Sequence, residues 1–527
     1  MSTPLHRDPP PWVSTLGGAL AEALPRLWGT PPDPLVVALI EALTRELERG
    51  ELAIDLQGPA PAGLDAAGWP QAHRRALEAS PLARDPQGPL ALEGRWLGWR
   101  RWHQLRAEVV AALVARAAQG EPAPAGPPLD PSLDALQQQA IHLALERNLL
   151  VLAGGPGTGK TSTVAHLLQA MAARLEGAVI QLAAPTGKAA ARLRQATGGQ
   201  WPCGTLHQVL ESRPDGEFRR HRERPLALDL LVVDEVSMVD LALMRALLAA
   251  LPERARLVLV GDPAQLPPVA PGAPLQELLR GEARQALAST TVTLRTTYRN
   301  AGAIATVAER LREIIEADDP TGGDPLEQLR PVLRLLPADA NLHWHQEPAG
   351  PLPSIVTQRL RAHLEQLRAA ARACVPGGQE GWRELFACRD ALLVLTPRHR
   401  GPWGVDAVHR QLLGEASAVG LGQWPSGTPV LCTRNLHGLG LSNGDLGVLV
   451  GGPERWLVFG QDQPLWLHPA QLSGALEPAL ALTVHKAQGS ESTTAMVLLP
   501  GPEPTDPRLI YTALTRARQE AWLVTPP

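Results

Sequence analysis

The segment Leu149–Thr161 reads LLVLAGGPGTGKT and is the most informative about the fold of this chain. A run of apolar residues typical of a buried strand leads into the spacing Gly154-x4-Gly159-Lys160-Thr161, and a helical pattern follows. Glycines at these positions let backbone N–H groups surround a triphosphate, and the N-terminus of the next helix adds positive partial charge. The segment therefore predicts a P-loop within a parallel α/β domain.

Two side chains of this loop have predicted roles of their own. Lys160 reaches the β- and γ-phosphate oxygens, and the Thr161 hydroxyl is a ligand for Mg²⁺. The sequence thus predicts a site for a nucleoside triphosphate and its metal ion. The predicted nucleotide-binding residues of the loop are Gly154, Gly155, Pro156, Gly157, Thr158, Gly159, Lys160, Thr161 and Ser162.

Two further apolar strands end in polar residues. Leu228–Asp240 (LDLLVVDEVSMVD) places Asp234 where it would hold Mg²⁺ through water, and Glu235 where it would orient the attacking water. Leu257–Pro268 (LVLVGDPAQLPP) places Gln265 where it can sense the γ-phosphate. Because the carboxyl ends of parallel strands meet at one edge of a sheet, we expect these side chains beside the P-loop.

The composition bounds the class of protein. The chain has 527 residues, 44% of them apolar, which is enough for several domains and excludes a small disulfide scaffold or a disordered chain. The formal net charge is −4, so nucleic acid would be bound in local grooves. The four cysteines have no CxxC spacing, which favours a reducing compartment. No apolar run reaches the ~18 residues of a membrane span, so we expect a cytoplasmic protein without a membrane partner.

Lysine and tyrosine are rare in this chain. It has three lysines (Lys160, Lys188 and Lys486) and two tyrosines (Tyr298 and Tyr511), and the other basic residues are arginines. A lysine that persists in such a chain indicates a site that needs a compact ammonium group, unless its placement is chance.

Short apolar runs alternate with helical segments after residue 133, which predicts parallel sheets. Gly427–Leu476, which lies between strands of the second predicted series, carries the turn signals of a small β-barrel insert. In the N-terminal part, which is predicted to be mostly helical, Trp96–Ala117 is a long amphipathic stretch. The predicted strands are Leu149–Ala153, Val179–Ala184, Leu230–Val233, Leu257–Val260, Val292–Leu294, Leu392–Thr396, Ala495–Leu499 and Ala521–Val524.

The order of the motifs resembles that of superfamily 1 helicases, and all three lysines and both tyrosines lie within motifs. Within that superfamily the chain is similar to the RecD family, the alpha subunits of exodeoxyribonuclease V, in GGPGTGKT, LVVDEVSMVD and RGPWGVDAVHRQL. The motifs that carry the resemblance are LDALQQQAI (Leu133–Ile141), APTGKAAARL (Ala184–Leu193), Thr205–His207, LRTTYRN (Leu294–Asn300), LTVHKAQGSE (Leu482–Glu491) and IYTALTRAR (Ile510–Arg518).

The resemblance implies roles for individual residues. Gln137 would read the adenine and Tyr298 would stack on it, while Arg299 and Arg516 would contact the γ-phosphate. The catalytic set it implies is Lys160, Asp234, Glu235, Gln265, Arg299 and Arg516. The residues it implies for DNA binding are Pro185, Thr186, Lys188, Thr205, His207, Thr483, His485, Lys486 and Ser490. For His207 and His485, a helix cap or a packed position is the alternative.

The resemblance also implies a domain plan: an α/β fold with two RecA-like P-loop domains, a small SH3-like β-barrel insert and a helical N-terminal domain. The expected ranges are 1–118 for the N-terminal partner-binding domain, 119–131 for a Pro- and Gly-rich linker, 132–300 for the first RecA-like domain with a short insert near 211–228, 301–420 and 479–527 for the second RecA-like domain, and 421–478 for the SH3-like insert.

The implied function is an ATP- and Mg²⁺-dependent 5′→3′ translocase and helicase on single-stranded and duplex-end DNA. It would be the motor of a heterotrimer with RecB-like and RecC-like subunits in double-strand break repair and recombination, with the nuclease in a partner. A stand-alone helicase of the same 1B branch is the first alternative. A non-translocating P-loop switch is the second, although such a switch could dispense with Glu235, Gln265, Arg299 and Arg516. The Trp96/Trp99/Trp102 series is either a partner contact or a core stripe.

Overall fold

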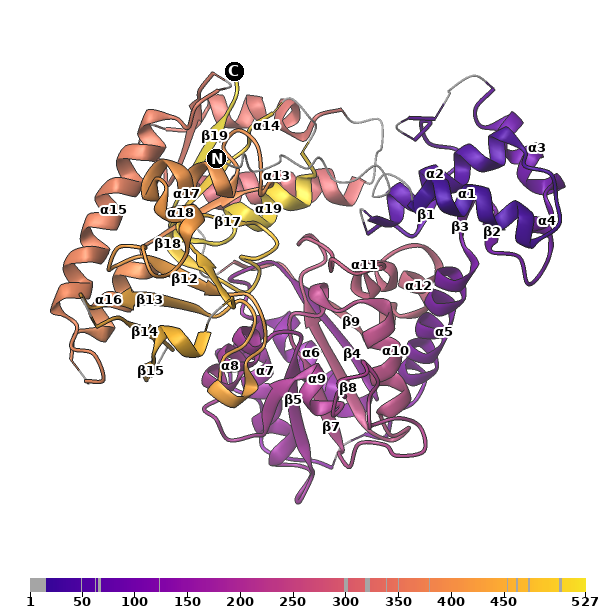
Figure 1. The fold of residues 1–527 in the computed structure, drawn as a ribbon. Helices are drawn as coiled ribbons and strands as arrows, with labels where there is room; N and C mark the ends of the chain where they lie inside the picture. The colour runs from indigo at the N-terminus through magenta and orange to yellow at the C-terminus, as the bar shows by residue number, and fades with distance from the viewer. Residues whose placement is uncertain are drawn as a thin grey trace.

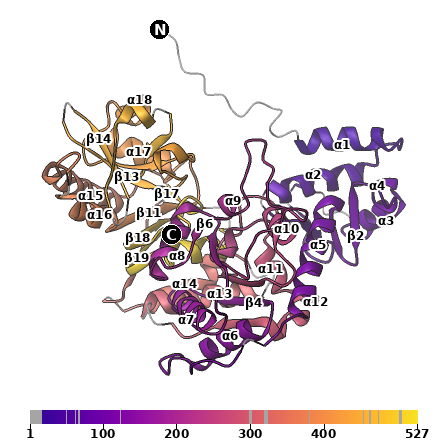
Figure 2. The same ribbon diagram turned by 90° about the horizontal axis from the view of Figure 1, so that it is seen from below.

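The computed structural model describes residues 16–48, 50–61, 63–64, 68–122, 124–297, 302–317, 323–337, 339–348, 350–378, 380–452, 454–460, 463–472, 474–501 and 505–527. Two α/β lobes lie one above the other in Figure 1, with an N-terminal part beside them. Figure 2 shows that this N-terminal part and an antiparallel sheet lie on opposite sides of the molecule.

The first lobe is built on a six-stranded parallel sheet. Its strand order is β6-β5-β7-β8-β4-β9. Five of these strands confirm the predicted ones with ends that differ by one residue at most, and β6 was not predicted. The strands are β4 (Leu149–Gly154), β5 (Ile180–Ala184), β6 (Cys203–Thr205), β7 (Leu230–Val233), β8 (Arg256–Gly261) and β9 (Thr291–Leu294).

Helices cover both faces of this sheet because successive strand residues point to opposite sides. Leu150 and Leu152 pack with one set of helices, and Leu149 and Val151 pack with the other. The first set is α6 (Ala135–Glu146), α7 (Lys160–Ala172) and α8 (Gly187–Ala196). The second set includes α5 (Arg100–Ala117), α9 (Leu206–Val209), α10 (Leu241–Ala250) and α11 (Pro274–Leu278), with α12 (Gly281–Ala286) next along the chain.

The second lobe repeats this architecture with a five-stranded parallel sheet in the order β10-β19-β18-β11-β17. Its strands are β10 (Leu342–Gln346), β11 (Leu392–Thr396), β17 (Leu482–Thr483), β18 (Ser492–Leu498) and β19 (Ala517–Thr525). Helices α13 (Ala303–Ala317), α14 (Pro325–Arg334) and α19 (Pro507–Leu514) cover one face, and α15 (Ser354–Ala373) and α17 (Val405–Leu413) cover the other.

A five-stranded antiparallel sheet is inserted in the second lobe, where the sequence predicts turns and short strands. Its order is β15-β14-β13-β12-β16, and one face packs on α15 and on α16 (Trp382–Arg389). The SH3-like character of this insert stays a prediction. Its strands are β12 (Pro429–Cys432), β13 (Leu446–Val450), β14 (Trp456–Phe459), β15 (Leu465–Leu467) and β16 (Leu476–Pro478), preceded by α18 (Ala416–Val419).

The N-terminal part is less helical than predicted. It combines α1 (Leu16–Leu27), α2 (Pro34–Glu48), α3 (Gln71–Ala79) and α4 (Pro81–Arg84) with a three-stranded antiparallel sheet of β1 (Ala53–Asp55), β3 (Trp96–Trp99) and β2 (Leu90–Glu93). The prediction of one helical stretch over Trp96–Ala117 is therefore wrong at its start. Its first four residues, two of them tryptophans that favour a pleated surface, form the central strand, and α5 begins only at Arg100.

Helix α5 also changes the expected division between domains. Leu105, Val109 and Leu113 are buried in the core of the first lobe beside α10, and not in the N-terminal core. The three tryptophans separate accordingly: Trp96 is 45% exposed, Trp99 packs on the N-terminal core, and Trp102 packs on the first lobe. They do not form one stripe. Among the described residues, no helix combines the length and apolar character that a membrane span needs.

Candidate nucleotide and DNA site

The P-loop follows the completely buried strand β4 and ends where α7 begins at Lys160. Two of its glycines have backbone angles that other residues adopt only with strain, since φ is 74° at Gly157 and 84° at Gly159. This curvature brings successive N–H groups toward one point at the N-terminus of α7, which is the arrangement that binds phosphate.

Lys160 lies inside the curve of the loop. Its Nζ donates hydrogen bonds to the carbonyl oxygens of Gly154 (2.7 Å) and Gly155 (2.9 Å), and the Thr158 hydroxyl also donates to Gly155 (2.8 Å). An ammonium held by neutral carbonyls can transfer to phosphate oxygens, which form stronger charge-assisted bonds. The structure thus brings the predicted lysine to the predicted loop.

Asp234 and Glu235 follow β7 at the same edge of the sheet. The Asp234 amide donates to the carbonyl of Ala183 (3.0 Å), and the Glu235 amide donates to Asp234 Oδ1 (2.9 Å). Glu235 has φ of 53°, a strained value for a non-glycine residue of the kind that clusters at functional sites. Burial, and then the Glu235 charge, raise the pKa of Asp234 to about 6.

These residues fit a divalent cation. A buried carboxylate whose ionisation is disfavoured gains from a nearby positive charge, and carboxylate and hydroxyl oxygens are ligands that Mg²⁺ prefers. The residues that would hold it are Asp234 and Thr161, which lies in the first turn of α7.

Gln265 follows β8 and is buried beside Asp262. In this region the two lobes meet, because the Leu266 amide donates to the Thr512 hydroxyl of α19 (2.9 Å) and Gln488 Nε2 donates to the Leu266 carbonyl (3.0 Å). The Leu266 side chain is itself part of the second lobe's core. The segment after β8 is therefore attached to both lobes.

A chain of hydrogen bonds crosses from the second lobe to Asp262. Arg312 Nη2 of α13 donates to the Tyr511 hydroxyl of α19 (2.9 Å), and that hydroxyl donates to Asp262 Oδ2 (2.9 Å). A Cβ at Gly155 would overlap the Arg312 guanidinium and would lie 3.1 Å from the Tyr511 oxygen. The second lobe thus contacts the P-loop.

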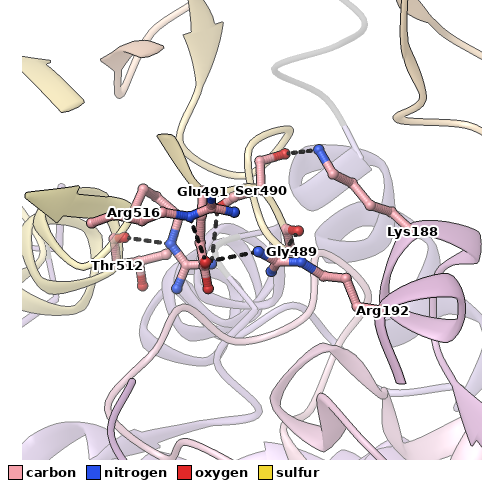
Figure 3. A network of polar contacts seen from close by, with 8 residues as sticks. Lys188, Arg192, Gly489, Ser490, Glu491, Thr512 and Arg516 are labelled. Atoms are coloured by element: carbon pink, nitrogen blue, oxygen red, sulfur yellow. Dashed lines mark hydrogen bonds and ion pairs between the residues drawn. The ribbon is translucent and has the colours of Figure 1, made fainter. Parts of the chain in front are cut away.

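Arg516, the predicted γ-phosphate contact, lies between α19 and β19 and is 3% exposed. Its Nε donates to the Thr512 carbonyl (3.0 Å) and its Nη1 to the Ser490 carbonyl (3.4 Å), as Figure 3 shows for Thr512. Within the described part of the chain, these hydrogen bonds stay in the second lobe. The γ-phosphate role of Arg516 therefore remains a prediction.

Helix α8 of the first lobe is joined to the segment Gly489–Glu491 of the second (Figure 3). Lys188 Nζ donates to the Ser490 hydroxyl (2.7 Å), and Arg192 donates to the Gly489 carbonyl (3.1 Å) and pairs with Glu491 (2.8 Å). Burial alone would raise the pKa of Glu491, but the charges of Arg192, Arg516 and Arg518 outweigh it and lower that pKa. We call this set of contacts the interlobe clasp.

Two residues predicted to bind DNA, Lys188 and Ser490, therefore bind each other. Burial, and then the neighbouring charges of Arg389 and Arg192, lower the pKa of Lys188 to about 8. A phosphate group in place of the serine hydroxyl would restore the charged form. This cluster joins the two lobes, and the DNA-binding role of both residues stays a prediction.

Other predicted DNA residues have local structural partners. The hydroxyl of Thr186 caps α8, that of Thr205 caps α9, and the exposed ring of His207 lies 5.8 Å from that of Phe218. Lys486 pairs with Glu477 of the antiparallel sheet. Of the remaining residues, Pro185 precedes Thr186, Thr483 is the last residue of β17, and His485 follows that strand. The DNA-binding role of all of these stays a prediction.

Three residues predicted to contact the nucleotide remain. Gln137 is buried in a capping box at the start of α6, where its side-chain oxygen accepts from the Asp134 amide (3.0 Å), so its adenine role stays a prediction. Tyr298 and Arg299 lie outside the described residues.

The site also contains residues for which the sequence motifs predict no role. Asp262, Tyr511 and Glu491 lie inside quoted motifs, so their types and positions could have suggested a role. Arg192 lies within APTGKAAARL but has no sequence feature that separates it from a surface residue. Arg312 lies in a plain amphipathic helix, and no signal in the sequence marks it.

This chain matches two protein families and is similar in sequence to several known proteins. The family described as "AAA domain" matches residues 137–271, and the "UvrD-like helicase C-terminal domain" matches residues 478–524. The "RecBCD enzyme subunit RecD" of Mycolicibacterium smegmatis is 39% identical over 74% of this chain and 70% of that protein. The protein of that name from Mycobacterium tuberculosis is 35% identical over 93% of this chain and 87% of its own length. The "ATP-dependent RecD2 DNA helicase" of Deinococcus radiodurans is 34% identical over 79% of this chain and 53% of that protein.

A P-loop lobe faced by a second parallel α/β lobe of the UvrD-like helicase type defines an ATP-dependent DNA helicase. The identity and coverage of the relatives go further: the chain belongs to the RecD family.

Proposed function

We propose that this protein is a 5′→3′ translocase on single-stranded DNA and the motor subunit of a helicase–nuclease with RecB-like and RecC-like partners. Its role would be the processing of duplex ends in double-strand break repair and homologous recombination. The observation that carries the motor function is the contact of the second lobe with the P-loop of the first. In this contact, Arg312 and Tyr511 lie against Gly155. A nucleotide between the lobes would therefore change how they fit together.

The chemistry follows from the groups at this edge of the first sheet. Lys160 would bind the β- and γ-phosphates, Glu235 would orient the attacking water, and Gln265 would report the γ-phosphate to the junction of the lobes. Mg²⁺ held by Thr161 and Asp234 would neutralise charge on the phosphates. Arg516 and Arg299 would complete the site when the lobes close, so that hydrolysis depends on closure.

DNA binding would use the surfaces that the interlobe clasp now joins. Lys188, Ser490 and their neighbours from both lobes would hold successive phosphates, and such contacts are independent of sequence and sensitive to salt. Alternate opening and closing would then shift the grip by about one nucleotide per ATP, since one lobe holds while the other moves.

The remaining parts of the chain would serve assembly. Of the predicted range 1–118, we assign the part before α5 to partner docking, with Trp96 on its surface, since α5 packs in the first lobe. We assign the five-stranded insert to an SH3-like 2B domain and 119–131 to a linker. The relatives named as RecBCD subunits support this assignment, because the chain spans 87% of the Mycobacterium tuberculosis protein and only 53% of the RecD2 helicase. A stand-alone helicase is the second candidate, supported by the 34% identity to that helicase.

Purification from the native cell separates these two candidates. We expect the tagged chain to bring down two larger proteins in equal amounts, and the complex to unwind and degrade duplex ends. A chain that elutes alone and unwinds 5′-tailed duplexes without help would support the stand-alone helicase instead.

The nucleotide site is tested by Lys160→Ala. We expect DNA-stimulated ATP hydrolysis to be lost while binding of single-stranded DNA is retained. Gln169→Ala, an exposed position on the same helix, is the control and should leave both unchanged. Turnover that persists in Lys160→Ala would refute the assignment of the P-loop.

A further inference from the structure

Arg312 of the second lobe lies against the P-loop. Its guanidinium occupies the space that a side chain at position 155 would take, so its approach depends on Gly155 having none. Arg312 comes from α13, which packs beside α19 at the side of the second lobe that faces the first (Figure 1). A positive charge from one lobe thus lies against the phosphate-binding loop of the other.

The direction of this guanidinium is fixed by two residues. It donates to the Tyr511 hydroxyl (2.9 Å), and its carbon lies 5.8 Å from the centre of the Tyr511 ring. Burial, and then the charge of Asp262, raise the pKa of Tyr511 well above its usual value, so the phenol keeps its proton and donates a hydrogen bond to Asp262 Oδ2 (2.9 Å). Asp262 therefore orients Tyr511, which in turn orients Arg312.

Most of the hydrogen-bonding capacity of Arg312 is unused. A guanidinium has five N–H donors, whereas among the described residues Arg312 has one hydrogen-bond partner and no ion pair. A half-buried guanidinium with unused N–H donors is stabilised by an anionic partner, and its planar group can donate two parallel hydrogen bonds to a pair of phosphate oxygens. The adjacent carbonyl of Gly155 already accepts from Lys160, so the two cations lie on the same segment of the loop.

We propose that Arg312 contacts the terminal phosphate of ATP, and that Tyr511 and Asp262 act as positioning residues for it. The inference rests on the proposed nucleotide site. It makes Arg312 the group by which the second lobe distinguishes a triphosphate from a diphosphate, because the α- and β-phosphates are bound by the first lobe. Arg516, whose hydrogen bonds stay within its own lobe, would join only on further closure.

The test compares the binding of two nucleotides to the full-length protein with Mg²⁺, namely fluorescent ADP and fluorescent ATPγS. In Arg312→Gln we expect ADP affinity within about 2-fold of the wild type, ATPγS affinity reduced by about 10- to 100-fold, and a similar or larger fall in kcat. Arg312→Lys keeps the positive charge but lacks the planar guanidinium, so its ATPγS affinity should lie between that of Arg312→Gln and that of the wild type. Tyr511→Phe removes only the orienting hydroxyl and should lower kcat by about 10-fold.

The matched control is Arg310→Gln on the same helix, since Arg310 is exposed and pairs with Glu313. It should bind and hydrolyse as the wild type does. Equal weakening of ADP and ATPγS in Arg312→Gln, or no weakening of either, would overturn the inference. If Arg312→Gln does not fold, the Arg312→Lys and Tyr511→Phe variants decide by the same comparison of the two nucleotides.

Failure of this inference can be told from failure of the proposed function by assaying Lys160→Ala in parallel. If Lys160→Ala is inactive while Arg312→Gln hydrolyses ATP normally, only the role of Arg312 is wrong. If Lys160→Ala hydrolyses ATP at the rate of the wild type, the nucleotide site itself lies elsewhere.

Discussion

The two lobes have the same architecture and differ in what they place at the site. Each has a parallel sheet covered by helices on both faces. In the first lobe, β4 leads into the glycine loop and Lys160. In the second lobe, β11 leads into Pro397 and Arg398 instead, and the groups that reach the first lobe come from α13, α19 and the segment after β17.

This difference shows how two lobes of the same architecture can take different roles, since the first can bind a nucleotide and the second can respond to it. The first lobe supplies backbone N–H groups that are rigidly placed by local turns. The second lobe supplies long cationic side chains whose distance from the loop depends on how the lobes sit together. Binding of the α- and β-phosphates should therefore depend on the first lobe alone, whereas recognition of the terminal phosphate and turnover should depend on both lobes.

The largest effect is expected for Arg516→Ala. Loss of a transition-state arginine should lower kcat for DNA-stimulated ATP hydrolysis by about 10³-fold, while ADP affinity changes little. The measurement is steady-state hydrolysis together with nucleotide titration. Arg518→Ala is the control, because Arg518 pairs with Glu491, whose pKa the charge of Arg516 also lowers, but Arg518 is more exposed than Arg516. Equal losses in both variants would show that Arg516 acts only through Glu491.

Glu235→Gln should reduce kcat by about 10²-fold through loss of the group that orients water. ATP binding should be retained, since the amide has the shape of the carboxyl group. Rapid-quench measurement of a single turnover separates hydrolysis from product release. Asp240→Asn, which affects only the cap of α10, is the control. A wild-type rate of single turnover in Glu235→Gln would assign the water to another residue.

The pH dependence of DNA binding should show whether Lys188 contacts a phosphate group. Its pKa of about 8 in the free protein means that the ammonium loses its proton as pH rises through 8, whereas a bound phosphate keeps it charged. Binding therefore takes up a proton above pH 8, and affinity for single-stranded DNA should fall by about 10-fold between pH 7 and 9. Fluorescence anisotropy with a labelled oligonucleotide measures this.

Lys188→Arg is the control, because a guanidinium stays charged over the whole range. Its affinity should vary with pH much less than that of the wild type. Equal slopes for the two proteins would contradict a role for Lys188 in binding phosphate.

The smallest effect is expected for the interlobe clasp. Removal of the half-buried Arg192–Glu491 pair by Arg192→Ala should destabilise the local contact by about 1 kcal/mol. Amide hydrogen exchange at residues 488–492 should then be about 5-fold faster. Arg194→Ala is the control, since Arg194 lies on the same helix but bonds to the Cys203 carbonyl within the first lobe. Unchanged exchange in Arg192→Ala would show that other contacts hold the lobes.

Motifs of contiguous residues were predictable, and contacts between distant elements were not. The strands around the P-loop and the positions of Asp234, Glu235 and Gln265 follow from local patterns. Trp96–Trp99 was mistaken for helix because aromatic residues at a spacing of three suit a helix face as well as a strand. Pairing with β1 and β2, which is a tertiary contact, decided for the strand.

The P-loop, the polar strand ends and the parallel sheets follow from local sequence patterns, since each depends on residues that are neighbours in the chain. The contacts of Arg312 with Gly155 and of Lys188 with Ser490 arise only in the folded protein, because each pair joins elements more than a hundred residues apart. Such a meeting depends on the packing of whole lobes, and no local spacing of residues encodes it.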